Sequence, residues 1–356
     1  MSRIMAHEEL SPLNITPGAI RFNTDSMKLE YFRIGMEGGS TSSYAGIGTM
    51  AAGEWVQITT DSPEVQTGGT RGVIAGGLDN PNTKDNMNYI NVDSVGTTLD
   101  FGTLSSGRFY AAGFGSRTHG FMAGASPGSI AIERWVTATT GSSADYTDLS
   151  QTRNYNPAGM SNSTRGVIAG GQRSDIEYIT MSSNAIGVNF GNLASGEIRY
   201  SNGSGNCTRG IIVVGIDQPA AVNTVEYITI STQGNSANFG DVTNTDGDGP
   251  FSCSNSTRVV RAGGGFPAGT LTIDSGEIAT LGDFLDFGDL TQSRYSADGM
   301  ASPTRGVFAG GAAHPSYYNT IDYVQFASKG NAVDFGDLLY QANYLSAVSN
   351  GHGGLG

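Results

Sequence analysis

Arginine and carboxylate side chains recur at fixed spacing along the chain. Five arginines follow a threonine in variants of the phrase Thr-Arg-Gly-Val-Ile-Ala-Gly-Gly, at Arg71, Arg165, Arg209, Arg258 and Arg305. A ring of guanidinium groups could bind an anion, because each group presents a planar fork of donors. Alternatively, the arginines pair with carboxylates of a second repeated phrase, such as Asp100, Asp286 or Asp334. Since the arginine recurs beside otherwise different loops, we expect structural pairing, and we interpret His119 in the second copy as a tolerated replacement.

The second phrase is a variant of Asp-Phe-Gly-Asp-Leu with an aromatic residue at its centre. Its six copies are centred on Phe101, Tyr146, Phe190, Phe239, Phe287 and Phe335. Protein kinases contain Asp-Phe-Gly once, together with a lysine strand and a catalytic loop that this sequence lacks. We therefore expect the carboxylates to cap a tight turn through hydrogen bonds from side chain to backbone.

Metal and redox chemistry finds few ligands in the sequence. Asp241, Asp246 and Asp248 lie in one acidic run, but the run lacks the glutamate of an EF-hand loop at the proper offset, which favours a solvated turn. The four histidines have no ligand spacing among them: His7, His119, His314 and His352. The two cysteines, Cys207 and Cys253, are expected to be free thiols. The sequence predicts no catalytic residue, no metal and no cofactor.

The two phrases recur every 44 to 49 residues, and this period defines the elements that must position them. In the last copy, residues 295–300, 304–311, 320–326 and 332–338 read as four short strands separated by turns. The 53 glycines fit an all-β structure with many tight reversals. A repeat of this length with four strands predicts the blades of a β-propeller.

Counting strands predicts how the ring closes. The second, third and fourth strands occur six times from Thr70 onwards, and candidate inner strands follow each fourth strand, near Phe109, Tyr155, Tyr200, Phe251, Tyr295 and Tyr344. The last inner strand has no later partners. We expect residues 343–350 to return to the blade begun by residues 70–104, so that residues 66–356 form a closed six-bladed propeller without exposed sheet edges.

This four-strand pattern resembles kelch-type propellers. In that family a glycine pair closes the second strand, a tyrosine marks the third and an aromatic residue marks the fourth, followed by an arginine. The glycine pairs here are Gly76-Gly77, Gly170-Gly171, Gly263-Gly264 and Gly310-Gly311. The third-strand aromatic residues are Tyr89, Trp135, Tyr178, Tyr227 and Tyr323, and the arginines are Arg108, Arg153, Arg199 and Arg294. Some kelch-type propellers are copper oxidases, but neither cysteine lies beside a candidate histidine here, so an enzyme is the weaker alternative.

Residues 1–65 lack the repeat and are expected to form a small β-arm. Residues 16–32 read as two alternating strands around an Asn-Thr-Asp-Ser turn, and residues 53–59 read as a third strand. Three short strands are marginal on their own, so we expect the arm to need a neighbouring chain. The run from Pro17 to Phe32 and the later Trp55-Val-Gln-Ile resemble a β-module of bacteriophage fibre and other virion surface proteins. The repeat phrases themselves resemble kelch-like proteins of marine tailed phages.

Charge and hydropathy exclude several partners. The net charge of −13 does not provide the basic stripe that phosphate binding needs, so no nucleic-acid partner is expected. No stretch approaches the ~20 apolar residues of a membrane span, and the N-terminus lacks the apolar run of a signal peptide. We expect synthesis in the host cytoplasm and a final location in the virion.

The resemblances imply a non-enzymatic particle component that is displayed on the surface and forms a homo-oligomer there. Residues 1–65 would attach it to other virion proteins, and the propeller would contact a host-surface glycan or protein, as in a tail-fibre or baseplate adhesin. The alternative is a capsid decoration protein anchored to the head by the arm. Specificity is expected in the variable loops between second and third strands: Leu78–Asn86, Ser126–Ile130, Gln172–Ser174, Asp217–Val222, Phe266–Gly269 and Ala312–Tyr318. Among these, His314, Tyr317 and Tyr318 are the first candidates for ligand contact.

Overall fold

The structure is a computed structural model that describes residues 19–23, 28–34, 53–57, 70–217, 220–245 and 247–355. The chain divides into two compact units, Met1–Pro63 and Glu64–Gly356. Within the described residues, strands are the only regular elements apart from one 3-10 turn, η3 (Gly353–Leu355). No helix in this part of the chain is long and apolar enough to cross a membrane.

The first unit contains a three-stranded antiparallel sheet. Its strands are β1 (Ile20–Asn23), β2 (Lys28–Ile34) and β3 (Gly53–Gln57), with β2 in the centre. Phe32 is buried, whereas Ile20 and Phe22 on the edge strand are 65% and 52% exposed. The unit therefore presents apolar side chains along one sheet edge.

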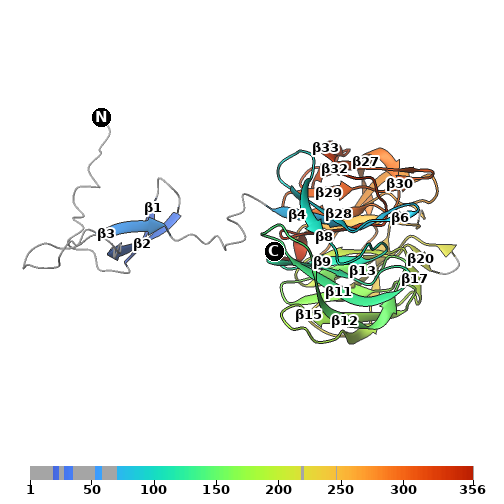
Figure 1. The fold of residues 1–356 in the computed structure, drawn as a ribbon, viewed down its shortest axis with the longest axis horizontal. Coiled ribbons are helices and arrows are strands. Elements are labelled where there is room, and N and C mark those ends of the chain that lie inside the picture. Colours follow the sequence, from blue (N-terminus) through green and yellow to red (C-terminus); the bar gives the residue numbers. More distant parts are fainter. Residues whose placement is uncertain are drawn as a thin grey trace, which may run out of the picture. The chain divides into compact units, whose positions relative to one another are not determined.

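The second unit is a six-bladed β-propeller (Figure 1). From the axis outwards, blade 1 is β34 (Ser346–Ser349), β4 (Arg71–Ala75), β7 (Asn86–Asn91) and β8 (Leu99–Thr103); blade 2 is β9 (Ala112–Gly115), β10 (His119–Ala123), β11 (Ser129–Val136) and β12 (Ala144–Arg153); blade 3 is β13 (Ala158–Ser161), β14 (Arg165–Ala169), β15 (Asp175–Thr180) and β16 (Val188–Asn192). Blade 4 is β18 (Asn202–Gly205), β19 (Arg209–Val213), β22 (Thr224–Thr229) and β23 (Ala237–Asp241); blade 5 is β24 (Phe251–Ser254), β25 (Arg258–Ala262), β26 (Thr270–Glu277) and β27 (Leu285–Arg294); blade 6 is β28 (Asp298–Ala301), β29 (Arg305–Ala309), β32 (Thr320–Gln325) and β33 (Val333–Asp337).

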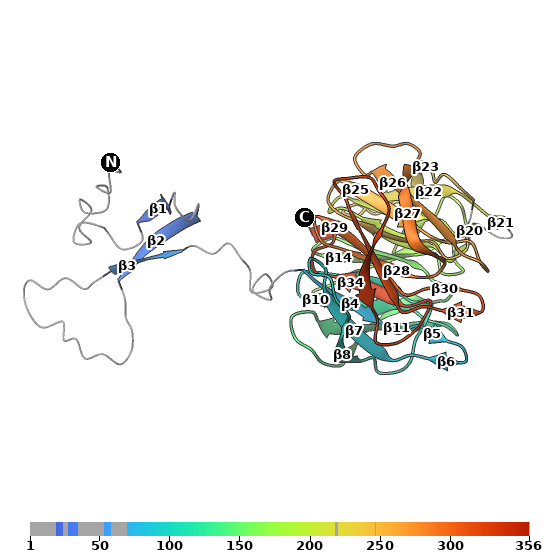
Figure 2. The same ribbon diagram turned by 90° about the horizontal axis from the view of Figure 1, so that it is seen from above.

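The ring closes as the strand count predicts. Strand β34 pairs antiparallel with β4, with Ser346 opposite Ala75 and Ser349 opposite Gly72. It therefore supplies the inner strand of the blade whose other three strands come from the start of the propeller. Figure 2 shows β34 between β28 of blade 6 and β4. The closed six-bladed fold is confirmed.

The Asp-Phe-Gly phrase forms a β-bulge in the fourth strand of each blade. In blade 5, Ile273 pairs with Gly288 and Asp274 with Asp286, so Phe287 between them has no partner in the register. A bulge leaves one residue outside the ladder. The freed Phe287 carbonyl accepts a hydrogen bond of 2.9 Å from the Gly330 N–H of the next blade. The same bulge occurs in all six blades.

The glycine of this phrase is required by that contact between blades. A Cβ on Gly288 would lie 2.4 Å from the carbonyl oxygen of Gly330, and its φ is +156°. A Cβ added to Gly102, Gly240 or Gly336 would likewise lie 2.3 to 2.5 Å from a glycine carbonyl oxygen of the following blade. Blade 2 has Thr147 in place of the glycine. There a backbone N–H of the next blade donates its hydrogen bond to the Asp148 carbonyl instead of the carbonyl of the bulged residue. The expectation that the carboxylates cap a tight turn is wrong, because Asp286 and Asp334 are exposed at the strand surface and the glycine makes the junction.

The hydrophobic core lies between neighbouring blades. Phe101 of blade 1, for example, packs in one cluster with Met122 and Trp135 of blade 2. Phe335 of blade 6 similarly shares a cluster with Ile74 and Ile90 of blade 1. Blue β4 accordingly lies beside the orange and red strands of blade 6 in Figure 1. Because each blade buries its apolar faces against two others, the ring stabilises itself as a whole.

Three of the loops between second and third strands form short hairpins of their own. These are β5 (Leu78–Asp79) with β6 (Asn82–Thr83), β20 (Ile216–Asp217) with β21 (Ala220–Ala221), and β30 (Ala312–Ala313) with β31 (Ser316–Tyr317). Strand β17 (Ile198–Arg199), which leads into blade 4, pairs with β20. Similarly, the Leu78 N–H bonds the carbonyl of Asn343, just before β34. The variable loops and the connections that lead into the inner strands therefore form one face, which we call the loop face.

Candidate functional site

Four of the five repeated arginines bridge neighbouring blades. The Arg71 guanidinium lies 4.6 Å over the Tyr89 ring and donates hydrogen bonds to the carbonyls of Thr137 and Ala138 in blade 2. Arg165, Arg209 and Arg305 stack in the same way on Tyr178, Tyr227 and Tyr323, and Arg258 instead pairs with Glu277. These contacts support a structural role. The expected pairing with fourth-strand carboxylates is wrong, because each guanidinium faces the third strand of its own blade. Except for Arg305, each also donates to a carbonyl at the end of the third strand of the next blade.

His119 is accommodated by a rearranged contact in blade 2. Here Arg134, from the third strand, lies 4.2 Å over the Tyr146 ring and provides the cation–π contact. The His119 Nδ1 lies 2.8 Å from the Thr118 hydroxyl, and burial together with Arg134 lowers the pKa of the imidazole.

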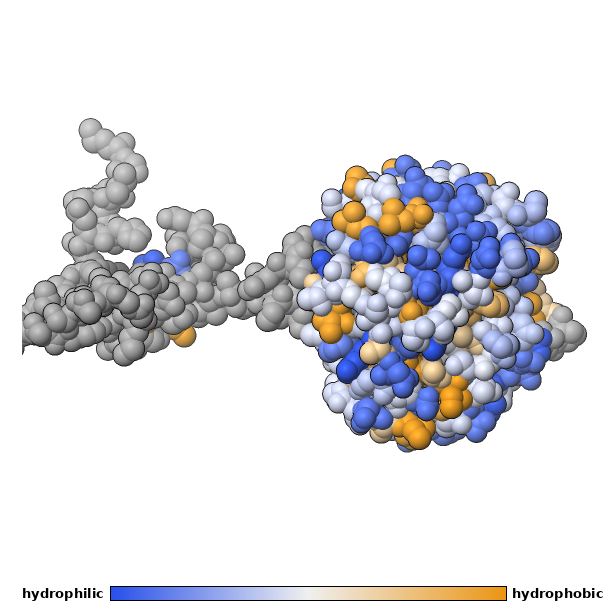
Figure 3. All heavy atoms as spheres, viewed as in Figure 1, coloured by the Kyte–Doolittle hydropathy of each residue, from blue (hydrophilic) through white to orange (hydrophobic). Residues whose placement is uncertain are grey.

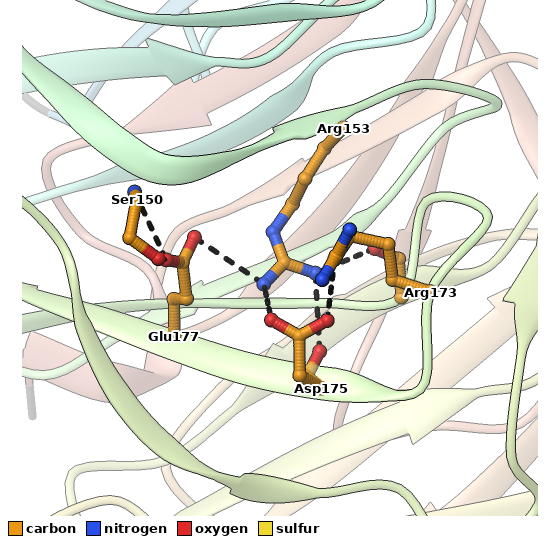
Figure 4. A network of polar contacts seen from close by, with 6 residues as sticks. Ser150, Arg153, Arg173, Asp175 and Glu177 are labelled. Carbon is orange, nitrogen blue, oxygen red and sulfur yellow. Dashed lines mark hydrogen bonds and ion pairs between the residues drawn. The ribbon is translucent and has the colours of Figure 1, made fainter.

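Buried carboxylates clamp each blade to the preceding one. In blade 3, Glu177 accepts a hydrogen bond of 3.0 Å from the Ser150 N–H and lies 3.3 Å from the Arg153 guanidinium, both on β12 (Figure 4). Arg153 also pairs with Asp175, which in turn contacts Arg173. Equivalent acids are Glu133, Glu226, Asp274 and Asp322, all at most 1% exposed. Arg108, Arg153 and Arg294, which lie at or beyond the ends of fourth strands, thus serve these clamps, whereas Arg199 pairs with Glu197.

At the closure between blades 6 and 1 an amide takes the place of the carboxylate. Asn88 Oδ1 accepts hydrogen bonds from the Leu339 N–H at 3.2 Å and the Thr98 hydroxyl at 3.1 Å. The clamp therefore extends around all six junctions. The sequence carries a signal for it, a polar residue at an inward position of each third strand, which the strand alternation alone does not explain.

The histidines and acidic residues considered for metal binding are dispersed. His119 lies on β10, His314 at an exposed hairpin tip and His352 beside η3, while His7 and Asp246 fall outside the described residues. In the part of the chain that the structure describes, no three His, Cys, Asp or Glu side chains are grouped as metal ligands. Cys207 is exposed and Cys253 is buried, and both are free thiols.

An aromatic cluster occupies the axis of the ring on the loop face. Its core is four tyrosines, Tyr110, Tyr155, Tyr200 and Tyr344, whose ring centroids are 4.0 to 6.3 Å apart in the contacting pairs. Tyr295, Tyr317 and Phe109 pack around them. Phe266, 53% exposed on the loop of blade 5, meets Tyr295 edge to face at 5.3 Å. Tyr110, Tyr155 and Tyr200 are half-buried, so they present part of their rings to solvent, whereas Tyr295 and Tyr344 are buried beneath them.

The backbone beneath the aromatic cluster is strained. The residue two positions before each inner strand has a positive φ in every blade: 61° at Tyr110, 54° at Asn156, 52° at Tyr200, 71° at Gly249, 53° at Ser296 and 53° at Tyr344. Such a conformation costs a bulky residue about 1–2 kcal/mol, whereas glycine adopts it freely. Blade 5 uses glycine at this position. The tyrosines are therefore held there against their backbone preference, which is a feature of functional positions.

Asp248 supplies the negative charge of the aromatic cluster. Burial raises the pKa of its carboxyl to about 6, so the group is ionised at neutral pH. Burial, with a contribution from Asp248, in turn raises the pKa of Tyr295 to about 12 and shifts the pKa of Tyr200 and Tyr344 upwards. Arg199 lies 4.9 Å over the Tyr155 ring. The cluster thus combines neutral phenols, one carboxylate and one guanidinium.

The three residues expected to contact a ligand lie in different settings. Tyr317 packs into the aromatic cluster, His314 is exposed at the tip of the β30–β31 hairpin, and Tyr318 is half-buried beside it. The His314 N–H bonds the Pro267 carbonyl and joins this hairpin to the loop that carries Phe266. The sequence marks the other members of the cluster only as aromatic residues ahead of each inner strand. It gives no sign that they converge on the axis.

The opposite end of the axis is closed by the C-terminal residues. A cavity of about 50 Å³ lies among the inner strands and is lined in part by Met160, Cys253 and His352. His352 Nε2 lies 3.0 Å from the Gly115 carbonyl, and its Nδ1 accepts a hydrogen bond from the Gly354 N–H. Arg117 donates to the carbonyl of Leu355. These bonds hold η3 against the inner strands and separate the cavity from that side.

Apolar side chains are scattered over the remaining surface. Figure 3 shows them in separate small groups among polar residues on the face drawn. Leu99, Leu285 and Val333, which begin fourth strands, are between 53% and 63% exposed. Scattered exposure of this kind is ordinary and marks no site. The aromatic cluster is therefore the best candidate for recognition in the described residues.

Comparison with known proteins supports the fold alone. No protein-family model and no curated protein matches this chain. Among solved structures, the chain is similar to the one titled "Structure of YjhT", with a TM-score of 0.57 and 12% sequence identity over 69% of this chain and 88% of that chain. At this identity, the likeness is one of propeller architecture.

Proposed function

We propose that this chain is a non-enzymatic structural protein of a bacteriophage particle. In this proposal it is a tail-fibre or baseplate-type adhesin, and its loop face contacts a host-surface glycan or protein, or a neighbouring virion protein. Residues 1–65 attach it to the particle, where it forms a homo-oligomer. The resemblance of the repeat phrases and of the arm to phage proteins motivates the particle setting.

The aromatic cluster carries the proposal of recognition. Tyrosine offers a large contact area at low entropic cost together with a hydrogen-bonding hydroxyl, and it is enriched where proteins bind partners. Here the tyrosines occupy strained positions at the centre of the face that bears the variable loops. Most arginines of the repeats and the buried carboxylates of the third strands, by contrast, are engaged between blades.

A cell-binding assay with two matched variants tests this proposal. Phe266 and Leu285 are similarly exposed apolar residues, at 53% and 63%, but only Phe266 adjoins the aromatic cluster. We expect labelled full-length protein to adsorb to the cells on which the particle grows. Phe266→Ser should weaken adsorption at least several-fold, and Leu285→Ser should not change it. Equal adsorption by both variants would contradict the role of the loop face.

The second candidate is a capsid decoration protein anchored by its arm. The exposed Ile20 and Phe22 lie on β1, an edge strand among the described residues, and favour an anchoring role for this sheet, because an apolar edge strand is suited to pairing with another chain. Replacing both by serine should prevent incorporation into particles while the propeller stays folded. Normal incorporation of the double variant into particles would contradict an anchoring role for this strand.

A further inference from the structure

Tyr110 and Tyr344 form the tightest aromatic pair described in the molecule. Their ring centroids are 4.0 Å apart, with an interplanar angle of 49°. Tyr110 leads into β9 of blade 2, and Tyr344 leads into the closing strand β34 of blade 1. A backbone hydrogen bond of 3.2 Å from the Tyr110 N–H to the Tyr344 carbonyl fixes their separation.

The two rings are held in this arrangement from several sides. Tyr344 is only 9% exposed, and its own N–H bonds the Ser296 carbonyl at 2.8 Å. Tyr200 lies 5.5 Å from Tyr110 and 6.3 Å from Tyr344. Both backbones have φ values that restrict the direction in which the side chain leaves the chain. The two rings are therefore held next to each other at short range, and radicals formed on them do not have to find one another by diffusion.

The aromatic cluster also contains a proton acceptor. The Asp248 carboxylate is ionised at neutral pH, and its Oδ1 makes no hydrogen bond in the described structure. Its negative charge contributes to raising the pKa of Tyr344 and of Tyr200. Because the phenols are neutral, removal of an electron from one of them must release a proton. Asp248 is placed to take it up.

We infer that Tyr110 and Tyr344 are a site of oxidative cross-linking, at which hydrogen peroxide activated to one-electron oxidants couples the two rings into dityrosine. Each phenol loses one electron and its hydroxyl proton, and one carbon ortho to each hydroxyl contributes to a new C–C bond. The two ring hydrogens at those carbons then move to the phenol oxygens and restore aromaticity. In total two protons and two electrons leave the protein and reduce one hydrogen peroxide to two waters.

The bond would lock the closure of the ring. Strand β34 is attached to blade 1 by hydrogen bonds and packing alone, and a link between positions 110 and 344 would tie it to blade 2 covalently. A cross-link over so long a stretch of chain restricts the unfolded state, as a disulfide does, and should raise the unfolding temperature by roughly 10 °C. The inference goes beyond the proposed function and does not depend on it.

Mass spectrometry of the oxidised full-length protein tests the inference. The protein is treated with hydrogen peroxide and a peroxidase, digested, and searched for a peptide pair containing Tyr110 and Tyr344 that has lost two hydrogens. We expect this pair to dominate the dityrosine products and the unfolding temperature to rise. Tyr344→Phe, which keeps the ring, should abolish the product, whereas Tyr323→Phe, whose ring packs on Phe335 in blade 6, should not. Asp248→Asn should slow its formation.

Two results would overturn the inference. One is dityrosine formed mainly at other tyrosines, including a Tyr110–Tyr200 pair. The other is the absence of a Tyr110–Tyr344 product when exposed tyrosines of the same sample are oxidised.

Discussion

Two glycines that face each other across one junction between blades provide a sharp test of how the ring is held together. A Cβ added to Gly191 of blade 3 would lie 2.1 Å from the carbonyl oxygen of Gly234 in blade 4. A Cβ added to Gly234 would meet nothing within 4 Å. Neither residue has a φ in the left-handed region, so backbone strain does not distinguish them. Gly191→Ala and Gly234→Ala therefore make the same chemical change with and without a collision.

The cost of the collision follows from the contacts at this junction. An ordinary contact of this type is at least 3.4 Å long, so the junction must open by about 1.3 Å to admit the methyl group. Opening stretches the hydrogen bonds from Gly234 N–H to the Phe190 carbonyl and from Ser236 N–H to the Asn192 carbonyl, now 2.9 and 3.0 Å. Each is worth about 1 kcal/mol. With the packing lost around Phe190, Gly191→Ala should lower the free energy of unfolding by about 2–4 kcal/mol.

Thermal and urea unfolding followed by circular dichroism measure this difference. We expect Gly191→Ala to lower the unfolding temperature by roughly 5–10 °C, and Gly234→Ala to remain within about 1 kcal/mol of the unmodified protein. If Gly191→Ala is as stable as the unmodified protein, or if both variants lose the same stability, the contact between blades is not what the glycine secures.

Three further changes test the closure and the buried titratable groups. Deletion of residues 340–356 removes β34 and should lower the unfolding temperature strongly and expose apolar surface; an unchanged midpoint would contradict closure by this strand. Burial, aided by Arg117, lowers the pKa of His352 to about 4. The stability that its neutral imidazole provides should therefore be lost as pH falls from 6.5 to 4. The difference in free energy of unfolding between the protein and His352→Gln should shrink over this range. Burial raises the pKa of Asp298 to about 6, so the folded state binds this proton more tightly than the unfolded state. The free energy of unfolding relative to Asp298→Asn should therefore rise as pH falls from 6 to 4. A difference in free energy that does not change with pH would contradict the burial of this carboxylate.

The architecture was accessible from the sequence because each blade repeats one local pattern. Strand alternation, glycine pairs and the period are local features, and counting inner strands near Tyr344 was sufficient to predict closure by β34. The contacts between blades were not accessible in this way. The backbone carbonyls that the repeated arginines reach in the next blade lie 65 to 69 positions further along the chain, so the sequence offers several partners of the right chemistry for each arginine. Arg71 illustrates the result, because its partners are the Tyr89 ring and two backbone carbonyls instead of Asp100.

The motif around Phe287 was misread for a related reason. Asp and Asn flanking an aromatic residue are typical turn-capping residues, and nothing local indicates a β-bulge whose carbonyl is used by another blade. The aromatic cluster was hidden by conformation. Tyrosine is not expected at positive φ, so Tyr200 and Tyr344 read as the beginnings of strands and not as side chains that turn towards the axis, and Tyr110 was not singled out beside Phe109. Only the fold shows that four such residues meet.

Immunogold labelling of intact particles with antibodies raised against the propeller tests the central claim most directly. The proposed adhesin predicts gold at the tail fibres or the baseplate. Gold confined to the head would contradict the adhesin and support the decoration protein, and particles that carry no gold at all would contradict a virion function.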